Sequence, residues 1–379
     1  MSNLSIIQID KVKTLVVKVG TTLLSGDRGF DGSILEGVVL DLIRLKQQRK
    51  MNILIVSSGA IGCGMDALGM TQRPKVLPLK QATAAVGQVR LMHYYESLLR
   101  VYGRGLSTAQ VLLSANDLDN RRTYLNVRNT INTLFQLGNV IPIVNENDST
   151  ATEELRFGDN DTLAAKIAAK INADLLIVLS NIDGLYDANP ARYGDAKLIQ
   201  HVEALTDEIE AAAGDTDAET STGGMKTKLE AARIACAAGL TMVIANGRRP
   251  NVIEQVLTNA CPATVFGKAG EAMPHRKRWI AFGRTPHGAV VVDDGARNAL
   301  VQHGKSLLPA GIVRVEGVFD AGDSIKVLDS VGRTIATGLV NYASDDIERI
   351  KGCKSAQLEV ILGRKDFDEV IHRDNLVLL

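Results

Sequence analysis

The apolar positions of this chain follow one rhythm up to residue 267. Short apolar runs are separated there by longer amphipathic stretches, which is the β-α alternation of a mostly parallel sheet. Between the first two runs, residues 34–45 place their apolar side chains on one helical face, so we expect a helix that covers the sheet. The runs expected to form strands are 14–19, 52–57, 140–145, 174–180 and 241–246.

After residue 267 the pattern changes. Residues 268–279 contain Gly270, Pro274 and mixed charges, which is typical of a linker. In residues 280–379, short β-like runs are separated by Gly and Asp turns, which predicts a small β-rich second domain. The full length of 379 residues is sufficient for this domain and a larger α/β domain over 1–267. The expected strands of the second domain are 289–292, 312–319, 324–328 and 334–340.

Polar and glycine-rich clusters directly follow the five apolar runs of the first domain. Ligands of open α/β sheets bind outside the carboxyl ends of the strands, so these clusters predict one site at that edge. The clusters are Gly20-Thr21-Thr22, Ser57-Ser58-Gly59-Ala60, Asn145-Glu146-Asn147-Asp148, Ser180-Asn181-Ile182-Asp183-Gly184 and Asn246-Gly247.

One further segment, Thr222-Gly223-Gly224-Met225-Lys226-Thr227-Lys228, suits a polyphosphate. Its glycines allow backbone N–H groups to approach an anion, and the start of a helix and the lysines add positive charge. Lys18 interrupts an apolar strand beside Gly20, where a buried ammonium group needs an anionic partner. Each feature has an alternative explanation. Residues 222–228 would be a plain turn with solvated lysines, and Lys18 would lie exposed at the edge of the sheet. The two features together predict a nucleotide phosphate site and a kinase.

Two clusters of carboxamides and carboxylates lie within twenty residues of each other, at 145–148 and 158–161. Both residue sets also occur in ordinary turns. In the functional interpretation, one cluster holds the ammonium group of a small zwitterionic substrate. The other orients the lysines or a Mg²⁺ ion, which prefers oxygen ligands.

The composition leaves several other classes of protein without support. Forty-three basic and 43 acidic residues cancel, so no overall field favours nucleic acid or an anionic membrane. The four cysteines form no C-x-x-C pair, and the six histidines show no zinc-hydrolase spacing. No apolar run approaches the roughly 20 residues of a membrane span. We therefore expect a cytoplasmic protein without a zinc site or a disulfide framework, and we assign no metal-ligating residue.

Two glycine motifs are weak matches to nucleotide-binding patterns. Residues 62–67 fit G-x-G-x-x-A but lack the acidic residue expected about twenty positions later. Gly304-Lys305-Ser306 resembles the end of a Walker A loop, but Ala299 stands at the leading glycine position. We interpret both as structural.

The ordered set of motifs resembles the amino acid kinase family, and within it the branch that phosphorylates glutamate. The resemblance covers nearly the whole chain, because the second domain is similar to the PUA domain that many bacterial members of this branch carry. The kinase motifs are Val17-Lys18-Val19-Gly20-Thr21, Ser57-Ser58-Gly59-Ala60-Ile61, Ala84-Ala85-Val86-Gly87-Gln88, Arg122-Thr123-Tyr124-Leu125-Asn126, Asn145-Glu146-Asn147-Asp148, Phe157-Gly158-Asp159-Asn160-Asp161 and the segment from Thr222 to Lys228. The PUA-like motifs are Val292-Asp293-Asp294-Gly295-Ala296, Ser306-Leu307-Leu308-Pro309-Ala310-Gly311 and Gly317-Val318-Phe319-Asp320-Ala321-Gly322-Asp323.

This resemblance implies roles for individual residues. Lys18 and Lys228 would contact the ATP phosphates and the transferring phosphoryl group, with Asp161 organising the two lysines. Glutamate would be bound by Ser58, Asp148 and Asn160. At Asn181 this sequence departs from the family, which usually has aspartate there, so a nucleotide contact at Asn181 is less well supported. The residues implied to bind ATP are Lys18, Ser180, Asn181, Thr222, Gly223, Gly224, Met225, Lys226, Thr227 and Lys228.

The resemblance also implies the reaction, the first step of proline biosynthesis. The side-chain carboxylate of glutamate attacks the γ-phosphorus of MgATP to give an acyl phosphate and ADP, and a carboxylate needs no general base at neutral pH. A homo-oligomer and an association with γ-glutamyl phosphate reductase are the expected assemblies. The alternatives are a family member with a different acceptor and an RNA-binding role of the PUA-like domain. Residues 280–379 carry 12 Lys and Arg against 14 Asp and Glu, a net charge of −2, which argues against RNA.

Overall fold

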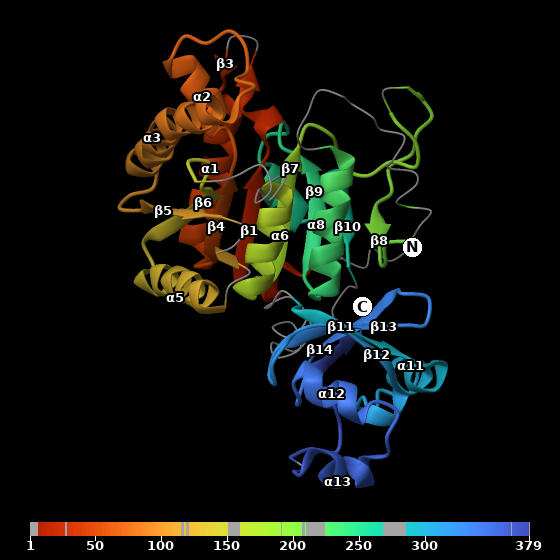
Figure 1. Ribbon diagram of the computed structural model, residues 1–379. Coiled ribbons are helices and arrows are strands. Elements are labelled where there is room, and N and C mark those ends of the chain that lie inside the picture. Colours follow the sequence, from red (N-terminus) through yellow and green to blue (C-terminus); the bar gives the residue numbers. More distant parts are fainter. Residues whose placement is uncertain are drawn as a thin grey trace. The chain divides into compact units, whose positions relative to one another are not determined.

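The computed structural model describes residues 7–26, 29–114, 117–118, 121–150, 160–190, 192–206, 209, 224–267, 286–364 and 366–378. The chain forms two compact units, each with its own sheet and hydrophobic core (Figure 1). The predicted linker 268–279 lies outside the described residues, so the domain limits 1–267 and 280–379 stay a prediction. No helix in the described part of the chain is long and apolar enough to cross a membrane.

The first unit contains an eight-stranded sheet in the order β5-β6-β4-β1-β7-β9-β10-β8. All neighbouring strands are parallel except β9 and β10, which are antiparallel, so the prediction of a mostly parallel sheet is confirmed. The strands are β1 (Thr14–Val19), β4 (Asn52–Ser57), β5 (Ser107–Leu113), β6 (Val140–Glu146), β7 (Leu175–Ser180), β8 (His201–Val202), β9 (Thr241–Asn246) and β10 (Ala263–Phe266), with a small hairpin of β2 (Ser25–Gly26) and β3 (Gly29–Phe30).

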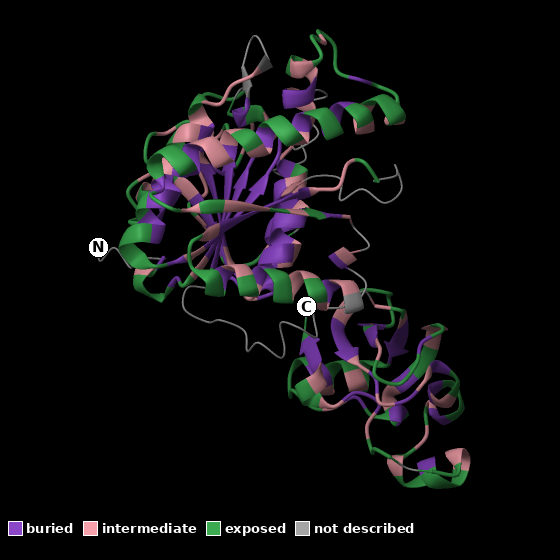
Figure 2. Ribbon diagram, turned by 90° about the vertical axis from the view of Figure 1, so that its left-hand side faces the viewer, coloured by how far each residue is buried: buried purple, intermediate pink, exposed green. Residues whose placement is uncertain are grey.

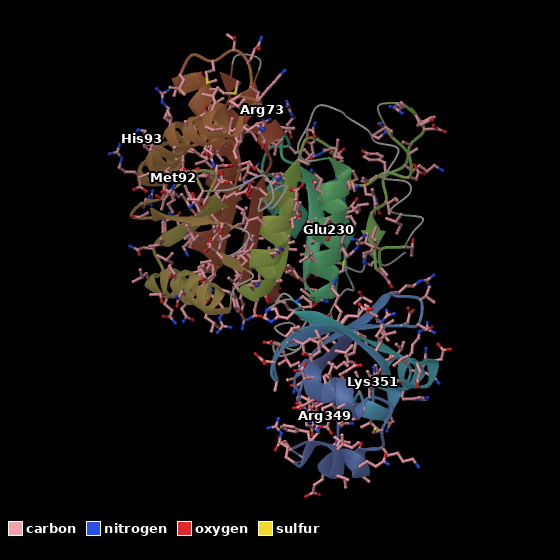
Figure 3. All side chains as sticks on the ribbon, viewed as in Figure 1. Arg73, Met92, His93, Glu230, Arg349 and Lys351 are labelled. Carbon is pink, nitrogen blue, oxygen red and sulfur yellow. The ribbon has the colours of Figure 1, made fainter. Side chains whose placement is uncertain are left out.

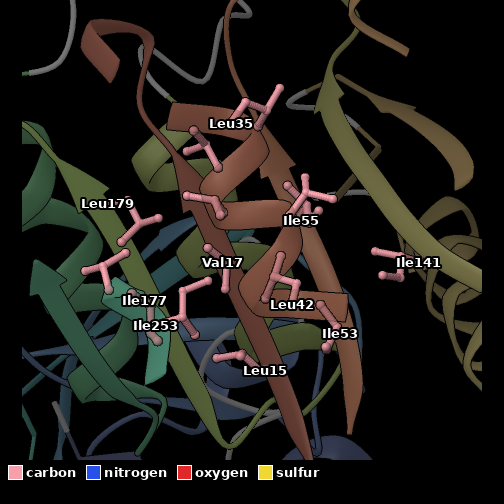
Figure 4. Packing of buried hydrophobic residues seen from close by; sticks show 14 of the residues in the cluster. Leu15, Val17, Leu35, Leu42, Ile53, Ile55, Ile141, Ile177, Leu179 and Ile253 are labelled. Carbon is pink, nitrogen blue, oxygen red and sulfur yellow. The ribbon is translucent and has the colours of Figure 1, made fainter. Parts of the chain in front are cut away.

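Helices cover both faces of this sheet, and the strand alternation decides which side chains meet them. Leu15, Val17 and Val19 of β1 belong to the core that α1 and α9 complete, as Figure 4 shows for part of this cluster. Since successive side chains of a strand point to opposite faces, Val16 and Lys18 face the other layer, which is formed by α6 and α8. The helices of the first unit are α1 (Ser33–Arg49), α2 (Ala60–Ala67), α3 (Leu77–Tyr102), α5 (Arg121–Leu137), α6 (Asn160–Lys170), α8 (Met225–Ala237) and α9 (Val252–Leu257).

Burial follows the predicted pattern. Figure 2 shows the strands buried and the outer helix faces exposed. In α1, apolar side chains of the expected face are buried, including Leu35, Val38 and Leu42, while Ile34 is half-buried against the same core. The edge strand β5 was not predicted, because it is half-exposed and its polar residues interrupt the apolar run.

The glycine pattern at 62–67 has a packing role. A Cβ atom at Gly64 would lie 1.9 Å from the carbonyl oxygen of Thr83, and one at Gly87 would lie 1.7 Å from that of Ala60. Both distances are impossible for a real side chain, so the two glycines allow α2 and α3 to cross with their backbones in contact. This close crossing fixes α3 relative to the loop that precedes α2.

The second unit has a five-stranded sheet in the order β12-β11-β13-β14-β15, and its core includes Val290, Ile325 and Ile347. Four of its strands lie at the predicted positions, and the short C-terminal strand β15 was not predicted. Gly304 has φ +57° in the turn after α11, which agrees with its interpretation as a turn residue. The elements are β11 (Gly288–Val292), α11 (Asp294–Val301), β12 (Ile312–Gly317), β13 (Ser324–Leu328), β14 (Thr334–Leu339), α12 (Ser344–Ile350), α13 (Leu358–Leu362) and β15 (Leu376–Leu378). Short 3₁₀ helices occur at Ile9–Lys11, Thr21–Leu23, Pro309–Gly311, Ser355–Gln357 and Arg373–Asn375.

Candidate active site

Three charged side chains from β1, α6 and α8 meet beside the sheet. Lys18 Nζ forms an ion pair with Asp161 Oδ1, and Lys228 Nζ lies 3.1 Å from Asp161 Oδ2. The three residues are 3%, 0% and 5% exposed, respectively. We call Lys18, Asp161 and Lys228 the charged triad.

The charged triad carries one positive charge in excess, since two ammonium groups surround one carboxylate. Burial alone would raise the pKa of Asp161, but the ammonium groups of Lys18 and Lys228 outweigh burial and hold this pKa below its ordinary value. The carboxylate is therefore ionised at neutral pH. Two ammonium groups held at one buried position are a suitable binding place for an anion such as a phosphate.

Two glycines flank the lysines of the charged triad. A Cβ atom at Gly20 would lie 3.1 Å from the Leu179 carbonyl oxygen and 3.6 Å from Lys18 Nζ, so glycine keeps the space beside this ammonium group open. Gly224 is the N-cap residue of α8 and has no side chain that could cap this helix. The N–H groups of the first turn of α8 therefore add donors on the same side.

Helical periodicity separates the lysines of α8. Lys228 is buried, whereas Lys226 is exposed, as is Glu230, which Figure 3 labels on the same helix. The Thr227 hydroxyl lies 3.1 Å from Asp161 Oδ2 and 2.9 Å from the carbonyl oxygen of Gly224, which connects the start of α8 to the charged triad. Thr222 and Gly223, also predicted to bind ATP, lie outside the described residues.

A network of uncharged polar groups begins at the residue next to Asp161. Asn160 Nδ2 lies 2.9 Å from Ser58 Oγ, 2.8 Å from the carbonyl oxygen of Ser57 and 3.0 Å from Asn145 Oδ1. Asn145 Nδ2 in turn donates to Gln88 Oε1 of α3 at 2.9 Å. We call Ser58, Asn145, Asn160 and Gln88 the amide network.

The sequence predicted part of this network. Ser58 and Asn160 were expected near each other and are hydrogen-bonded, while Gln88 belonged to a recognised motif but had no assigned role. Tyr95 was missed altogether, although its hydroxyl lies 2.9 Å from Ser57 Oγ and burial raises its pKa, so that it stays neutral. An isolated polar residue on a helix gives no sequence signal that distinguishes it from a surface position.

Asp148 lies close to the amide network along the chain. It is half-buried in the turn that follows β6, where the Thr150 N–H donates to the Asn147 carbonyl oxygen at 3.1 Å. Its position three residues after Asn145 brings the 145–148 cluster to the carboxyl end of β6, as predicted.

Another part of the same sheet edge joins the loops after β7 and β9. Ser180 is buried at the end of β7, and the following Asn181 is exposed. The Gly247 N–H donates to the Ser180 carbonyl oxygen at 2.8 Å, and Arg249 donates to both carboxylate oxygens of Asp183 at 3.0 Å. The Asp183–Arg249 pair was not predicted, because its partners are 66 residues apart.

Two family models match this chain. Residues 13–246 match the model of the amino acid kinase family. The chain belongs to the amino acid kinase family. Residues 288–362 match the model of the PUA domain, as the sequence predicted for the second unit.

Several glutamate 5-kinases are similar to this chain over nearly its full length. A glutamate 5-kinase of Caldanaerobacter subterraneus subsp. tengcongensis is 48% identical over 366 residues, which are 96% of this chain and 97% of that protein. A glutamate 5-kinase of Geobacter sp. (strain M21) is 45% identical over 372 residues, 98% of this chain and 99% of that protein. Among solved structures, the isopentenyl phosphate kinase of T. acidophilum matches with a TM-score of 0.47 and 16% identity, over 67% of this chain and 99% of its own. That likeness is too distant to carry an argument.

As a kinase of this family, the protein uses ATP. In the described part of the chain, no group of three His, Cys, Asp or Glu side chains forms a metal site.

Proposed function

We propose that this kinase transfers the γ-phosphoryl group of MgATP to the side-chain carboxylate of L-glutamate. The products are L-glutamyl 5-phosphate and ADP, and the reaction is the first step of proline biosynthesis. The names of the full-length relatives support the substrate. The observation that carries the proposal is that Asn160 and Asp161 are consecutive residues of α6. Asn160 belongs to the amide network, where we place the amino acid, and Asp161 to the charged triad, where we place the phosphates.

The charged triad would act on the phosphates. Lys18 and Lys228 would neutralise the charge on the transferring phosphoryl group, and Asp161 would hold both ammonium groups in place. Since phosphoryl transfer depends mainly on positioning and charge neutralisation, these side chains need not take up or release a proton. The glutamate carboxylate is already ionised and serves as the nucleophile.

The remaining site residues would position the two substrates. Ser58 and Asn160 are proposed to contact glutamate, and Asp148 is proposed to pair with its ammonium group. ATP would be held by Ser180, Asn181 and residues 222–228. At Asn181, an amide side chain is able to hydrogen-bond a ribose or base in the way that the family's usual aspartate does.

Two alternatives predict different partners. A kinase of the same family that phosphorylates another acceptor would use the same charged triad. Selection between glutamate and another acceptor therefore depends on the amide network. An RNA-binding role would rest on the second unit, whose net charge of −2 over residues 280–379 gives little attraction for phosphates. A filter-binding titration with RNA at low salt tests the latter.

An acceptor screen tests the proposed function. Acyl phosphates formed from MgATP react with hydroxylamine to give hydroxamates, which are measured by their colour with ferric ion. We expect glutamate to give hydroxamate, and aspartate and N-acetylglutamate to give little. UMP, which is not expected to give an acyl phosphate, is followed by ADP release. Equal or faster turnover of any of these three would contradict the glutamate assignment.

A homo-oligomer, an association with γ-glutamyl phosphate reductase and a cytoplasmic location are further parts of the proposal. The first two are tested by light scattering of the purified kinase alone and after mixing with the reductase. A monomer that gives no heavier species on mixing would contradict both.

A further inference from the structure

Gln88 ends the amide network with a donor that has no partner. Its Oε1 accepts the hydrogen bond from Asn145 Nδ2 at 2.9 Å. Its Nε2 is buried and forms no hydrogen bond with any described residue. A buried N–H group without a partner costs about 1–3 kcal/mol, so such a group needs an explanation.

The bonding pattern fixes which end of the Gln88 carboxamide faces Asn145. Asn145 Oδ1 accepts from the Glu146 N–H at 2.9 Å and lies 3.0 Å from Asn160 Nδ2. The other end of the Asn145 carboxamide must therefore be the NH₂ group, which is a donor only. The Gln88 atom that it meets has to be the oxygen, which leaves Gln88 Nε2 as the unpaired group.

The helix that carries Gln88 is held in place by the adjacent glycine. Because Gly87 lies in backbone contact with α2 at Ala60, α3 cannot shift at this point without losing the crossing. Ala60 is two residues from Ser58, whose hydroxyl belongs to the same network. Gln88 thus has a fixed position relative to the proposed glutamate site.

We propose that Gln88 helps to bind the amino acid substrate by donating its Nε2 hydrogen bond to the α-carboxylate. This inference rests on the proposed function. The charged triad adjoins Asn160, and Gln88 lies at the other end of the network, two hydrogen bonds away through Asn145. The reacting carboxylate belongs beside the charged triad, so the carboxylate that does not react belongs at the Gln88 end.

Two substitutions distinguish this donor from a simple support for Asn145. Gln88→Glu keeps an oxygen acceptor for Asn145 but replaces the donor by an anionic oxygen, which repels a carboxylate. Gln88→Met removes both groups at similar volume. Gln47→Met is a matched control, because Gln47 on α1 also uses its amide in a local hydrogen bond, to the Gly103 carbonyl oxygen at 3.2 Å.

We expect Gln88→Glu to raise KM for glutamate on the order of 100-fold and Gln88→Met about tenfold, since one hydrogen bond to a charged group corresponds to about 1.5–3 kcal/mol. The α-carboxylate binds equally in the ground state and the transition state, so kcat should change less than about twofold. KM for ATP should equal that of the wild type in all three variants, and Gln47→Met should leave KM for glutamate and kcat unchanged. Urea denaturation checks that each variant is folded under the assay conditions.

Two outcomes would overturn the inference. A wild-type KM in Gln88→Glu would reduce Gln88 to a support for Asn145. A fall in kcat in both Gln88 variants, with KM unchanged, would place the donor on the reacting carboxylate instead. If Gln88→Met does not fold, Gln88→Glu alone decides.

Calorimetric titration with glutamate separates this inference from the proposed function. A wild-type chain that binds glutamate without forming hydroxamate contradicts the proposed function, while a Kd raised by Gln88→Glu still supports the role of Gln88. A wild-type chain that does not bind glutamate contradicts both.

Discussion

Asn160 and Asp161 are neighbours at the start of α6, but they belong to different parts of the candidate active site. Asp161 lies among charges, with Lys18 and Lys228 on its two oxygens. Asn160 lies among neutral groups, with the Ser58 hydroxyl and the Asn145 carboxamide as partners. The first turn of α6 therefore places one side chain among charged groups and its neighbour among neutral polar groups.

The difference matches what each part has to do in the proposed reaction. Charge on the phosphates changes between ground state and transition state, so full charges near them affect the rate. The α-amino and α-carboxylate groups of the amino acid do not react, so their contacts bind and orient the substrate without acting in the chemical step. Substitutions in the charged triad should therefore change kcat, and substitutions around the amide network should change KM for glutamate.

The largest expected effect concerns Asp161. Asp161→Asn removes the anion shared by two buried ammonium groups, and breaking a buried ion pair costs about 3–5 kcal/mol. We expect urea denaturation to show a loss of this size. A loss below about 1 kcal/mol would mean that the lysines are satisfied without the carboxylate.

The pH dependence sharpens this prediction. Because the folded state lowers the pKa of Asp161, its contribution to stability is complete above the ordinary value of 3.8 and is lost as the pH falls through the folded pKa. The stability difference between wild type and Asp161→Asn should be constant above about pH 5 and shrink below about pH 4. A difference that grows on acidification would contradict the direction of the shift.

For the lysines, we expect Lys228→Ala and Lys18→Ala to lower kcat on the order of 100-fold or more, since each loses charge that acts in the transition state. Lys226→Ala is the matched control on α8, because its side chain is exposed. Steady-state kinetics with glutamate and MgATP measure both parameters. A Lys228 variant with wild-type kcat and only a raised KM for ATP would remove Lys228 from the chemical step.

In the acceptor part of the site, Asp148→Ala should raise KM for glutamate by about tenfold or more through loss of a charged partner for the substrate ammonium group. Its kcat should remain within about threefold of the wild type. Initial rates at varied glutamate and saturating MgATP measure this split. If KM for glutamate does not change, the ammonium group is not bound by Asp148.

The smallest effect is expected from removing the second unit. A chain that ends near Arg278 should still fold and form glutamyl hydroxamate, because the first unit has its own core and contains all the proposed site residues. Activity per folded molecule, with folding checked by circular dichroism and solution size, is the measurement. A folded truncation without activity would show that the PUA-like unit is needed for the reaction.

The sequence by itself indicated most of the central strands and the residues that are proposed to form the site. The expected strand limits agree with β1, β4, β9 and β13, because buried strands require continuous apolar runs. Lys18 was also visible, since a charge in an apolar strand stands out locally, and Asp161 was assigned through the family resemblance of the carboxamide and carboxylate cluster at 158–161.

Only the tertiary structure decided which of these side chains meet. Lys228 and Asp161, which are in contact, are 67 residues apart in the sequence. Asn145 and Gln88, which are hydrogen-bonded, are 57 residues apart. These contacts depend on strand order and on how the helices cross, whereas local periodicity reports only which face of an element is buried. The same reason explains the misses: β5 is a half-exposed edge strand, and Gln88, Tyr95 and Arg249 acquire their partners only when distant elements pack together.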